Sequence, residues 1–211
     1  MKLNRVIFAA VLLAGAAQFV FSQAPAGYSY KAQRAFIPAD LGEVYIGMPF
    51  RDFVKKIDIR DAEADTRFDY IHLNIAYEKG PIDGLTVRVH GFTREQIKAM
   101  SKEVEVTVKG DLGDYTVKEE RIDPSKIEGD GFVYAFYIGF KPDFDLKSWV
   151  IKTYGNDGEV RKPDGEYHFF DIQWTKKTDD GLDWLIRSFH EGDGRSLQLL
   201  GRISGTEWAV D

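Results

Sequence analysis

Short segments in which apolar and polar residues alternate follow one another from residue 68 onwards. In the first of them, 68–77, Ile71, Leu73 and Ile75 fall on one side of an extended backbone and His72 falls on the other. Successive side chains of a strand point to opposite faces of its sheet, so this period of two predicts strands with one buried face. Turns rich in glycine and aspartate separate the segments, which indicates a mainly antiparallel sheet.

This reasoning predicts about nine strands: 25–36 (a strand or an extended arm), 68–77, 85–92, 103–110, 114–122, 131–140, 166–175, 181–189 and 195–204. The segment 131–140 is apolar on both faces, which predicts a central strand.

Three short amphipathic helices are expected among these strands, after Pro49, after Thr93 and in 143–154. Thr93 precedes Gln96 by three positions, the spacing of a capping box. The fold class is therefore α+β with predominantly antiparallel sheet. The helices and strands can be grouped into repeated helix-plus-meander units, 49–90, 93–140 and 143–204. A β-barrel-like closure of the sheet is the alternative.

The N-terminal residues have the layout of a secretory signal peptide, 1–24. Lys2 and Arg5 precede an apolar run, and Ser22 and Ala24 precede a cleavage point before Pro25. Cleavage after Ser22 is the alternative to cleavage before Pro25. Residues 25–211 then form a single domain of an exported protein, in the bacterial periplasm or outside the cell. They contain no second apolar run long enough to cross a membrane.

The net charge and the absence of cysteine limit the partners and the chemistry that can be expected. The chain has a net charge of −6, and loss of Lys2 and Arg5 with the signal peptide leaves −8. No stripe of basic residues stands out in the sequence, so nucleic acid is not expected as a partner. The chain has no cysteine, which excludes disulfides, thiol catalysis and a lipid-anchor cysteine.

The string Glu-Gly-Asp-Gly occurs twice, at 128–131 and 191–194. Asp-Gly is typical of tight hairpin turns because glycine tolerates positive φ. A calcium loop would instead place oxygen ligands at alternate positions over about a dozen residues. We therefore interpret both copies as hairpin turns, with a repeated cation site as the alternative.

The segment 45–57, YIGMPFRDFVKKI, carries Gly47, Met48, Phe53 and Val54 at its entry into a helix. It resembles the corresponding part of small exported α+β modules, namely the outer-membrane-assembly lipoprotein BamE and the β-lactamase-inhibitor-protein superfold. The resemblance implies a binding or scaffolding module without catalysis. The chain departs from both groups, because it lacks the lipid-anchor cysteine of the first and the disulfides of the second.

Candidate catalytic and metal sites are few. If the 68–90 hairpin turned about Pro81, His72 and His90 would be opposed on its polar face, a candidate pair of metal ligands. A zinc site needs three or four ligands, and Arg88 nearby repels a cation, so no metal is expected. No serine-hydrolase elbow, phosphate loop or metalloprotease motif occurs, and no cofactor is expected.

Aromatic residues are the richer signal, at 14% of the chain. The candidate ligand-binding residues are Tyr134, Phe136, Tyr137, Trp174 and Trp184. In a regular strand, Tyr134 and Phe136 would share one face of 131–140 and Tyr137 the other, so one tyrosine hydroxyl would lie near water or a ligand.

These observations favour an exported non-enzymatic binding or envelope-associated module with an unknown protein partner. The alternatives are a carrier of a small apolar ligand in an aromatic-lined pocket of a curved sheet, and a secreted hydrolase with an unrecognised site.

If the protein is exported, cleavage of the signal peptide should shorten its chain at the N-terminus. Protein recovered from the periplasm or medium of a bacterial host should have the intact mass of a chain that begins at Pro25, or at Gln23 for the rival cleavage. Recovery of the full-length mass from that fraction would contradict the assignment of 1–24 as a cleaved signal.

Overall fold

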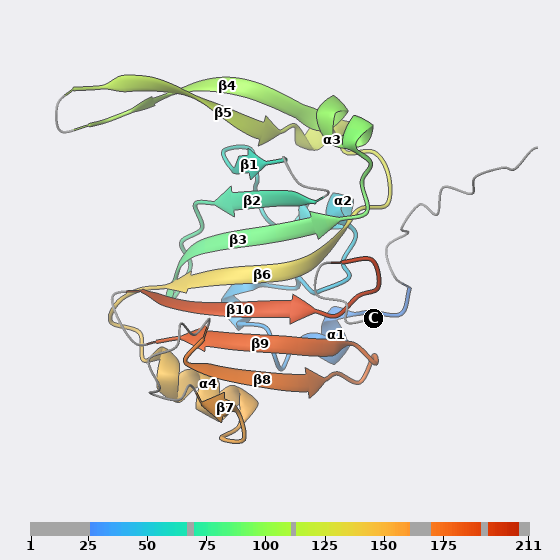
Figure 1. Ribbon diagram of the computed structural model, residues 1–211, viewed down its shortest axis with the longest axis vertical. Coiled ribbons are helices and arrows are strands. Elements are labelled where there is room, and N and C mark those ends of the chain that lie inside the picture. The colour runs from blue at the N-terminus through green and yellow to red at the C-terminus, as the bar shows by residue number, and fades with distance from the viewer. Residues whose placement is uncertain (1–25, 67–69, 111–112, 161–169, 191–193, 207–211) are drawn as a thin grey trace, which may run out of the picture.

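The computed structural model describes residues 26–66, 70–110, 113–160, 170–190 and 194–206. The predicted signal peptide and the second Glu-Gly-Asp-Gly copy, apart from Gly194, lie outside these residues. Eight strands within the described ranges form one antiparallel sheet in the order β1-β2-β3-β6-β10-β9-β8-β7 (Figure 1). The strands are β1 (Glu63–Asp65), β2 (Ile71–Ile75), β3 (Ile82–His90), β6 (Phe132–Phe140), β7 (Glu159–Val160), β8 (Ile172–Lys177), β9 (Asp183–Phe189) and β10 (Arg195–Gly201).

Strand β6 lies at the centre of this sheet. It pairs with β3 on one side and with β10 on the other, and so joins a run of β1, β2 and β3 to a meander of β7 to β10. Strands β1 and β7 are the two edges, so the sheet is open and the barrel-like alternative does not describe it. The predicted α+β class with mainly antiparallel sheet is confirmed.

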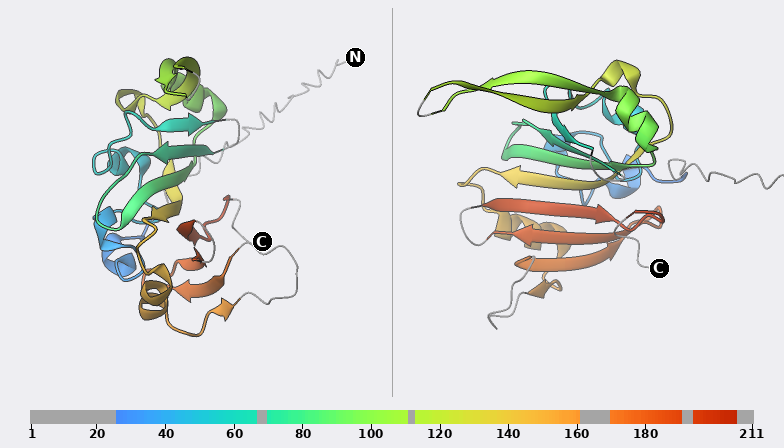
Figure 2. Two further views of the ribbon diagram at one scale, coloured as in Figure 1. Left: turned by 90° about the vertical axis from the view of Figure 1, so that its left-hand side faces the viewer. Right: turned by 45° about the horizontal axis from the view of Figure 1, so that its top comes forward.

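Short helices and irregular chain cover one face of the sheet (Figure 2), which we call the core face. The helices of the described residues are α1 (Tyr30–Gln33), α2 (Phe50–Phe53), α3 (Arg94–Met100) and α4 (Leu146–Tyr154), with 3-10 turns η1 (Ala39–Leu41) and η2 (Pro124–Lys126). The Phe53 ring of α2 packs 6.4 Å from Phe136 of β6, and the Trp149 ring of α4 packs 6.2 Å from Phe140. Burial of these rings fixes the helices on this face.

The helix ends follow the expected local chemistry. The Thr93 hydroxyl accepts from the Gln96 N–H and the Gln96 side chain accepts from the Thr93 N–H, which completes the predicted capping box. Helix α4 is capped by the Asp145 carboxylate and ends at Gly155, whose φ is 95°.

The prediction of a strand or extended arm at 25–36 is wrong. Ser29 caps α1, and the side chain of Gln33, the last residue of α1, is fully buried. The Gln33 amide accepts from the Ile46 N–H and donates to the Ile46 carbonyl, both at 2.9 Å. These two bonds hold the helix against Ile46.

Strands β4 (Ser101–Val108) and β5 (Tyr115–Ile122) form a separate two-stranded ribbon that extends beyond the ends of the other strands (Figure 1). Each of the three proposed units begins with a helix followed by strands, but the strands of 93–140 are divided between the ribbon and the large sheet. The three segments therefore do not share one arrangement.

The first Glu-Gly-Asp-Gly copy does not form the predicted hairpin turn. It connects η2, after the ribbon, to β6 of the large sheet. Gly129 has a φ of 108°, and a Cβ on Gly131 would lie 2.0 Å from the Phe92 ring. The glycines therefore let this connection pass close to Phe92 and Gln96 in the segment that follows β3.

Asp180, in the turn between β8 and β9, ties α1 to the far half of the sheet. Its carboxylate accepts from the Ser29 N–H at 3.0 Å and from the Gln33 amide at 3.2 Å. Burial opposes its ionisation, but hydrogen bonds from Thr178, Ser29 and Gln33 outweigh burial and lower the pKa of Asp180.

A lowered pKa in the folded state means that ionised Asp180 stabilises the fold above its unfolded pKa of about 3.9 and that this contribution is lost in acid. Asp180→Asn should therefore destabilise the protein at pH 7, and the difference from wild type should shrink as the pH falls below about 4. Urea unfolding at pH 7, 5 and 3 measures this. A difference that does not change with pH, or one no larger than that of the exposed neighbour variant Asp179→Asn, would contradict the role of Asp180.

Candidate functional site

The face of the sheet opposite the core face carries mostly polar side chains, and we call it the polar face. One row of cross-strand neighbours crosses it at mid-height: Asn74 of β2, Thr86 of β3, Tyr137 of β6, Gln198 of β10, Arg187 of β9 and Gln173 of β8. The alternation of β2 and β3 predicted this face, with His72 and Asn74 turned away from the core.

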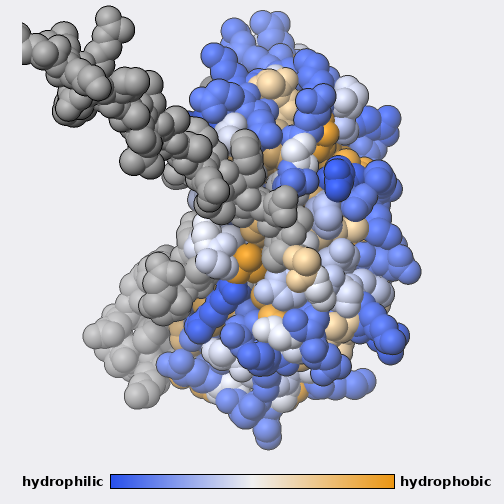
Figure 3. Space-filling model, turned by 90° about the vertical axis from the view of Figure 1, so that its right-hand side faces the viewer, coloured by the Kyte–Doolittle hydropathy of each residue, from blue (hydrophilic) through white to orange (hydrophobic). Residues whose placement is uncertain are grey.

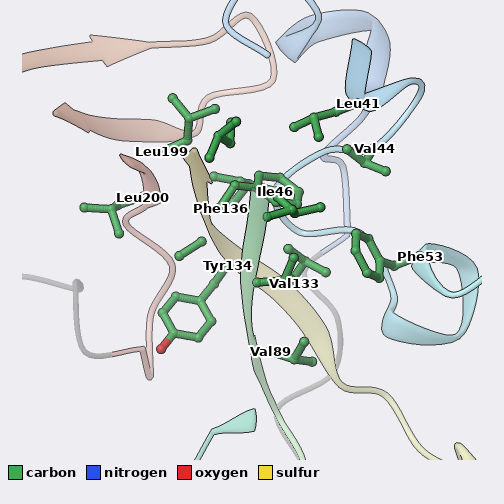
Figure 4. Close-up of a cluster of buried hydrophobic side chains, with 14 of the residues drawn as sticks. Leu41, Val44, Ile46, Phe53, Val89, Val133, Tyr134, Phe136, Leu199 and Leu200 are labelled. Carbon is green, nitrogen blue, oxygen red and sulfur yellow. The ribbon is translucent and has the colours of Figure 1, made fainter. Parts of the chain in front are cut away.

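A β-bulge in β6 changes which residues reach the polar face. Arg88 is paired with Ala135 and Val89 with Val133, so Tyr134 is an extra residue in the pairing with β3. The Tyr134 ring lies on the side of β6 away from Phe53 (Figure 4). The prediction that Tyr134 shares a face with Phe136 is therefore wrong.

An arginine stands between two tyrosine rings on the polar face. The Arg88 guanidinium lies 4.7 Å from the ring centroid of Tyr137 and 5.2 Å from that of Tyr70. The His72 ring lies parallel to Tyr137 at 6.5 Å. Guanidinium–aromatic contacts of this length are attractive.

Tyr134, the extra residue of the bulge, contacts further aromatic rings beside Arg88 and Tyr137. Tyr134 meets Tyr70 edge-to-face at 6.1 Å and His90 at 6.2 Å. We call the six residues the Arg88 cluster: Tyr70, His72, Arg88, His90, Tyr134 and Tyr137. Its side chains come from β2, β3, β6 and the residue before β2.

The expected opposition of His72 and His90 is wrong. His72 is paired with Arg88 on β3, and His90 is paired with Phe132 on β6. The register of the β2–β3 hairpin differs by two residues from the predicted one. Among the residues described, no group of three or more histidine, aspartate or glutamate side chains is placed to hold a metal ion.

Arg187 is another cation of the polar face. Its Nε–H donates to the Gln173 side chain at 2.7 Å, and its guanidinium lies 5.9 Å from the Phe170 ring centroid. Burial lowers the pKa of Arg187, and the nearby Tyr137 hydroxyl opposes this effect. Sequence reasoning missed Arg187, although its place in an alternating strand was a usable signal.

A groove of about 570 Å³ begins at Tyr137 and runs toward the ribbon. Its lining includes Asn74, Thr86 and Ser196 from the sheet, and Arg121 from β5. Arg121 bridges two acids at the groove rim, Asp61 at 3.0 Å and Glu119 at 3.1 Å. At the end of the sheet seen in Figure 3, hydrophilic residues cover most of the described surface, with small apolar areas between them.

The other predicted aromatic residues are distributed differently. Phe136 and Trp184 are fully buried in the core and line no described pocket. Trp174 lines a second pocket of about 190 Å³ together with Ile151, Ile172 and Val160. Its indole N–H donates to the Gly155 carbonyl at 3.1 Å.

A histidine, an aspartate and a serine also meet beside this pocket. The backbone N–H of His190 donates to the Asp171 carboxylate at 2.7 Å, and both side chains are almost fully buried. Ser188 Oγ and Asp171 Oδ2 approach the same ring nitrogen, Nδ1, at 3.4 and 3.9 Å. A catalytic triad needs the serine and the carboxylate on different ring nitrogens, so this arrangement is not one.

Comparisons with known proteins add no family. No family model matches the chain, and no curated protein or solved structure is detectably similar to it. In the part of the chain that the structure describes, no helix has the length and apolar character needed to span a membrane.

The Arg88 cluster predicts a measurable coupling between Arg88 and Tyr137. In a double-mutant cycle of Arg88→Ala and Tyr137→Leu, the two effects on the free energy of unfolding should differ from additivity by about 0.5–2 kcal/mol. A cycle of Arg51→Ala, on α2, with Tyr137→Leu is the control and should be additive. Additivity in both cycles would show that Arg88 and Tyr137 do not stabilise each other.

Proposed function

We propose that the protein is an exported, non-enzymatic binding module of the bacterial periplasm or extracellular space, and that a protein partner binds on its polar face. The observation that carries this proposal is the Arg88 cluster beside the groove. Tyr134 of this cluster is fully buried, and its other tyrosine, histidine and arginine side chains are half-buried on the sheet face that the described helices leave uncovered.

The composition of the cluster supports protein binding. Tyrosine and arginine are enriched among the residues that contribute most to interface affinity. The groove volume also falls within the range of about 300–1,000 Å³ that is usual for ligand sites. The two features adjoin at Tyr137, so one partner can contact both.

The resemblance of 45–57 to small exported binding modules supports the same class. Met48 and Phe53 are buried in the core and belong to the packing of the fold. The resemblance therefore bears on architecture, whereas the binding face is inferred from the sheet.

A carrier of a small apolar ligand is the second candidate, and the Trp174 pocket is the observation in its favour. A dry apolar cavity of about 150 Å³ is large enough to bind benzene. The pocket of about 190 Å³ has room for a ligand of similar size, such as a single ring. Binding of a ring-sized apolar ligand that quenches tryptophan fluorescence would favour this candidate.

Site-specific photocrosslinking tests the proposed binding face. A photoreactive phenylalanine analogue at Asn74, which is exposed and lines the groove, should give a discrete protein adduct in the envelope of the native host. The same analogue at Lys152, exposed on α4, is the matched control and should give none. Adducts from Lys152 and none from Asn74 would move the partner to another face and sink the proposal.

A further inference from the structure

The ribbon has one backbone edge that no other described strand covers. Its strand β5 is tied to the body of the protein, because the Glu120 carboxylate accepts from the Thr66 hydroxyl at 2.6 Å and Arg121 pairs with Asp61 at 3.0 Å. Within the described ranges, the backbone of β4 pairs with β5 alone, in one register without a bulge. The outer edge of β4 therefore presents N–H and C=O groups on which a further strand can form (Figure 1).

One face of the ribbon is apolar, although the ribbon projects beyond the large sheet. Directly opposed residues of an antiparallel pair share a face, so Val106 lies beside Val117, and Val108 lies beside Tyr115. Val104 continues this face along β4. The valines are half-buried and Tyr115 is 54% exposed. A two-stranded hairpin is only marginally stable in water, so a further strand beside β4 would stabilise the ribbon.

The opposite face of β4 has acidic residues toward one end and a lysine at the other. Glu103 and Glu105 are exposed on it, and the exposed Lys109 follows the last residue of β4 at the same spacing of two. One oxygen of Glu103 accepts from Lys118 of β5 at 2.7 Å, and a carboxylate has a second acceptor oxygen. A strand with this distribution of charge is complementary to a second copy of itself in the antiparallel direction.

We propose that the outer edge of β4 pairs with the same edge of a second copy of the chain, about a twofold axis at Val106. In this register Val106 lies opposite its own copy, and Val104 lies opposite Val108 on both sides of the axis. On the other face Glu103 lies opposite Lys109, again twice. The two ribbons then form a four-stranded sheet with one continuous apolar face.

Other antiparallel registers that keep the two apolar faces on the same side match less well. An axis at Val104 would set Glu103 opposite Glu105, and an axis at Glu105 would set that residue opposite its own copy. Like charges that are directly opposed destabilise a strand pair. An axis at Thr107 would set Glu105 opposite Lys109, but pairing that ends at Lys109 would then use a shorter stretch of each strand.

The proposed contact is small and closed. Residues 103–109 of each copy take part, whereas a stable interface has about 20–30 residues a side, so the dimer should dissociate on dilution. A twofold axis uses both outer edges, which leaves no edge of β4 for further growth. The inference goes beyond the proposed function, because the ribbon edge and the polar face of the large sheet are different surfaces and either assignment can fail alone.

Single cysteines test the register, because the chain has no cysteine of its own. Val106→Cys should form a disulfide-linked dimer when the mature protein is mildly oxidised, since directly opposed Cα atoms lie about 4.5–5.5 Å apart. Thr107→Cys and Glu105→Cys should crosslink at least about tenfold more slowly, because each lies two residues away from its own copy, too far for a disulfide. Equal rates in the three variants, or a faster rate in either control, would overturn the assignment.

Charge exchange tests the pairing without a covalent bond. Sedimentation velocity of the mature protein between about 10 μM and about 1 mM should show a mass that doubles with concentration. Lys109→Glu should raise the dissociation constant about tenfold, because two symmetry-related contacts change from attraction to repulsion. Adding Glu103→Lys to that variant should restore the dimer. Lys152→Glu, on α4, changes the net charge equally and should have no effect.

Three results would overturn the proposal. They are a monomer at every concentration, a loss in Lys109→Glu that Glu103→Lys does not restore, and an equal loss in Lys152→Glu. Discrete adducts with another protein from a photoreactive analogue at Val106, with the mature protein monomeric, would assign the edge to that protein instead. Urea unfolding checks that each variant is folded, and the charge variants at exposed positions still decide if a cysteine variant is not.

Discussion

The fold depends on the pairing of β6 with both halves of the sheet. Strand β6 is hydrogen-bonded to β3 on one side and to β10 on the other. Near the start of β6, residues 47–50 replace β10 as its hydrogen-bonded neighbour, through bonds donated by the Gly47 N–H and the Val133 N–H. Its side chains are nearly all buried, so it contributes apolar surface to both faces. Without β6 the first three strands and the last four would be two small sheets, each too narrow to bury its own apolar face.

The same strand creates the candidate site, through one irregularity. An extra residue at Tyr134 turns its ring onto the face that also carries Tyr137. There Tyr134 packs against Tyr70 and His90, and Tyr137 packs against Arg88. Tyr134 is itself fully buried, but a regular β6 would have placed its ring on the core face with Phe136. The bulge therefore links the architecture to the surface that we propose as the binding face, in keeping with the frequent use of bulges to redirect side chains at functional sites.

Much of the architecture follows from local patterns in the sequence, and the site follows from long-range pairing. The alternation of apolar and polar residues around Leu73 and around Val87 predicted two strands and their buried faces, because the period of two depends only on the local backbone. The capping box at Thr93 was also predictable, because it joins residues only three positions apart. Register and bulges depend on which strand lies alongside, so the pairing of His72 with Arg88 and the turning of Tyr134 were missed. The short α1 was missed because a buried amide, Gln33, holds it through contacts with Ile46.

Hydrogen–deuterium exchange, resolved by peptide mass spectrometry on the mature protein, tests the central role of β6 most directly. If β6 joins the two halves into one sheet, the amides of β3, β6 and β10 should be the slowest to exchange and should open together, whereas those of the projecting ribbon, β4 and β5, should exchange much earlier. If the amides of β6 exchanged as fast as those of the ribbon, or if the two halves of the sheet opened independently at the boundary between β6 and β10, the single-sheet account would be contradicted.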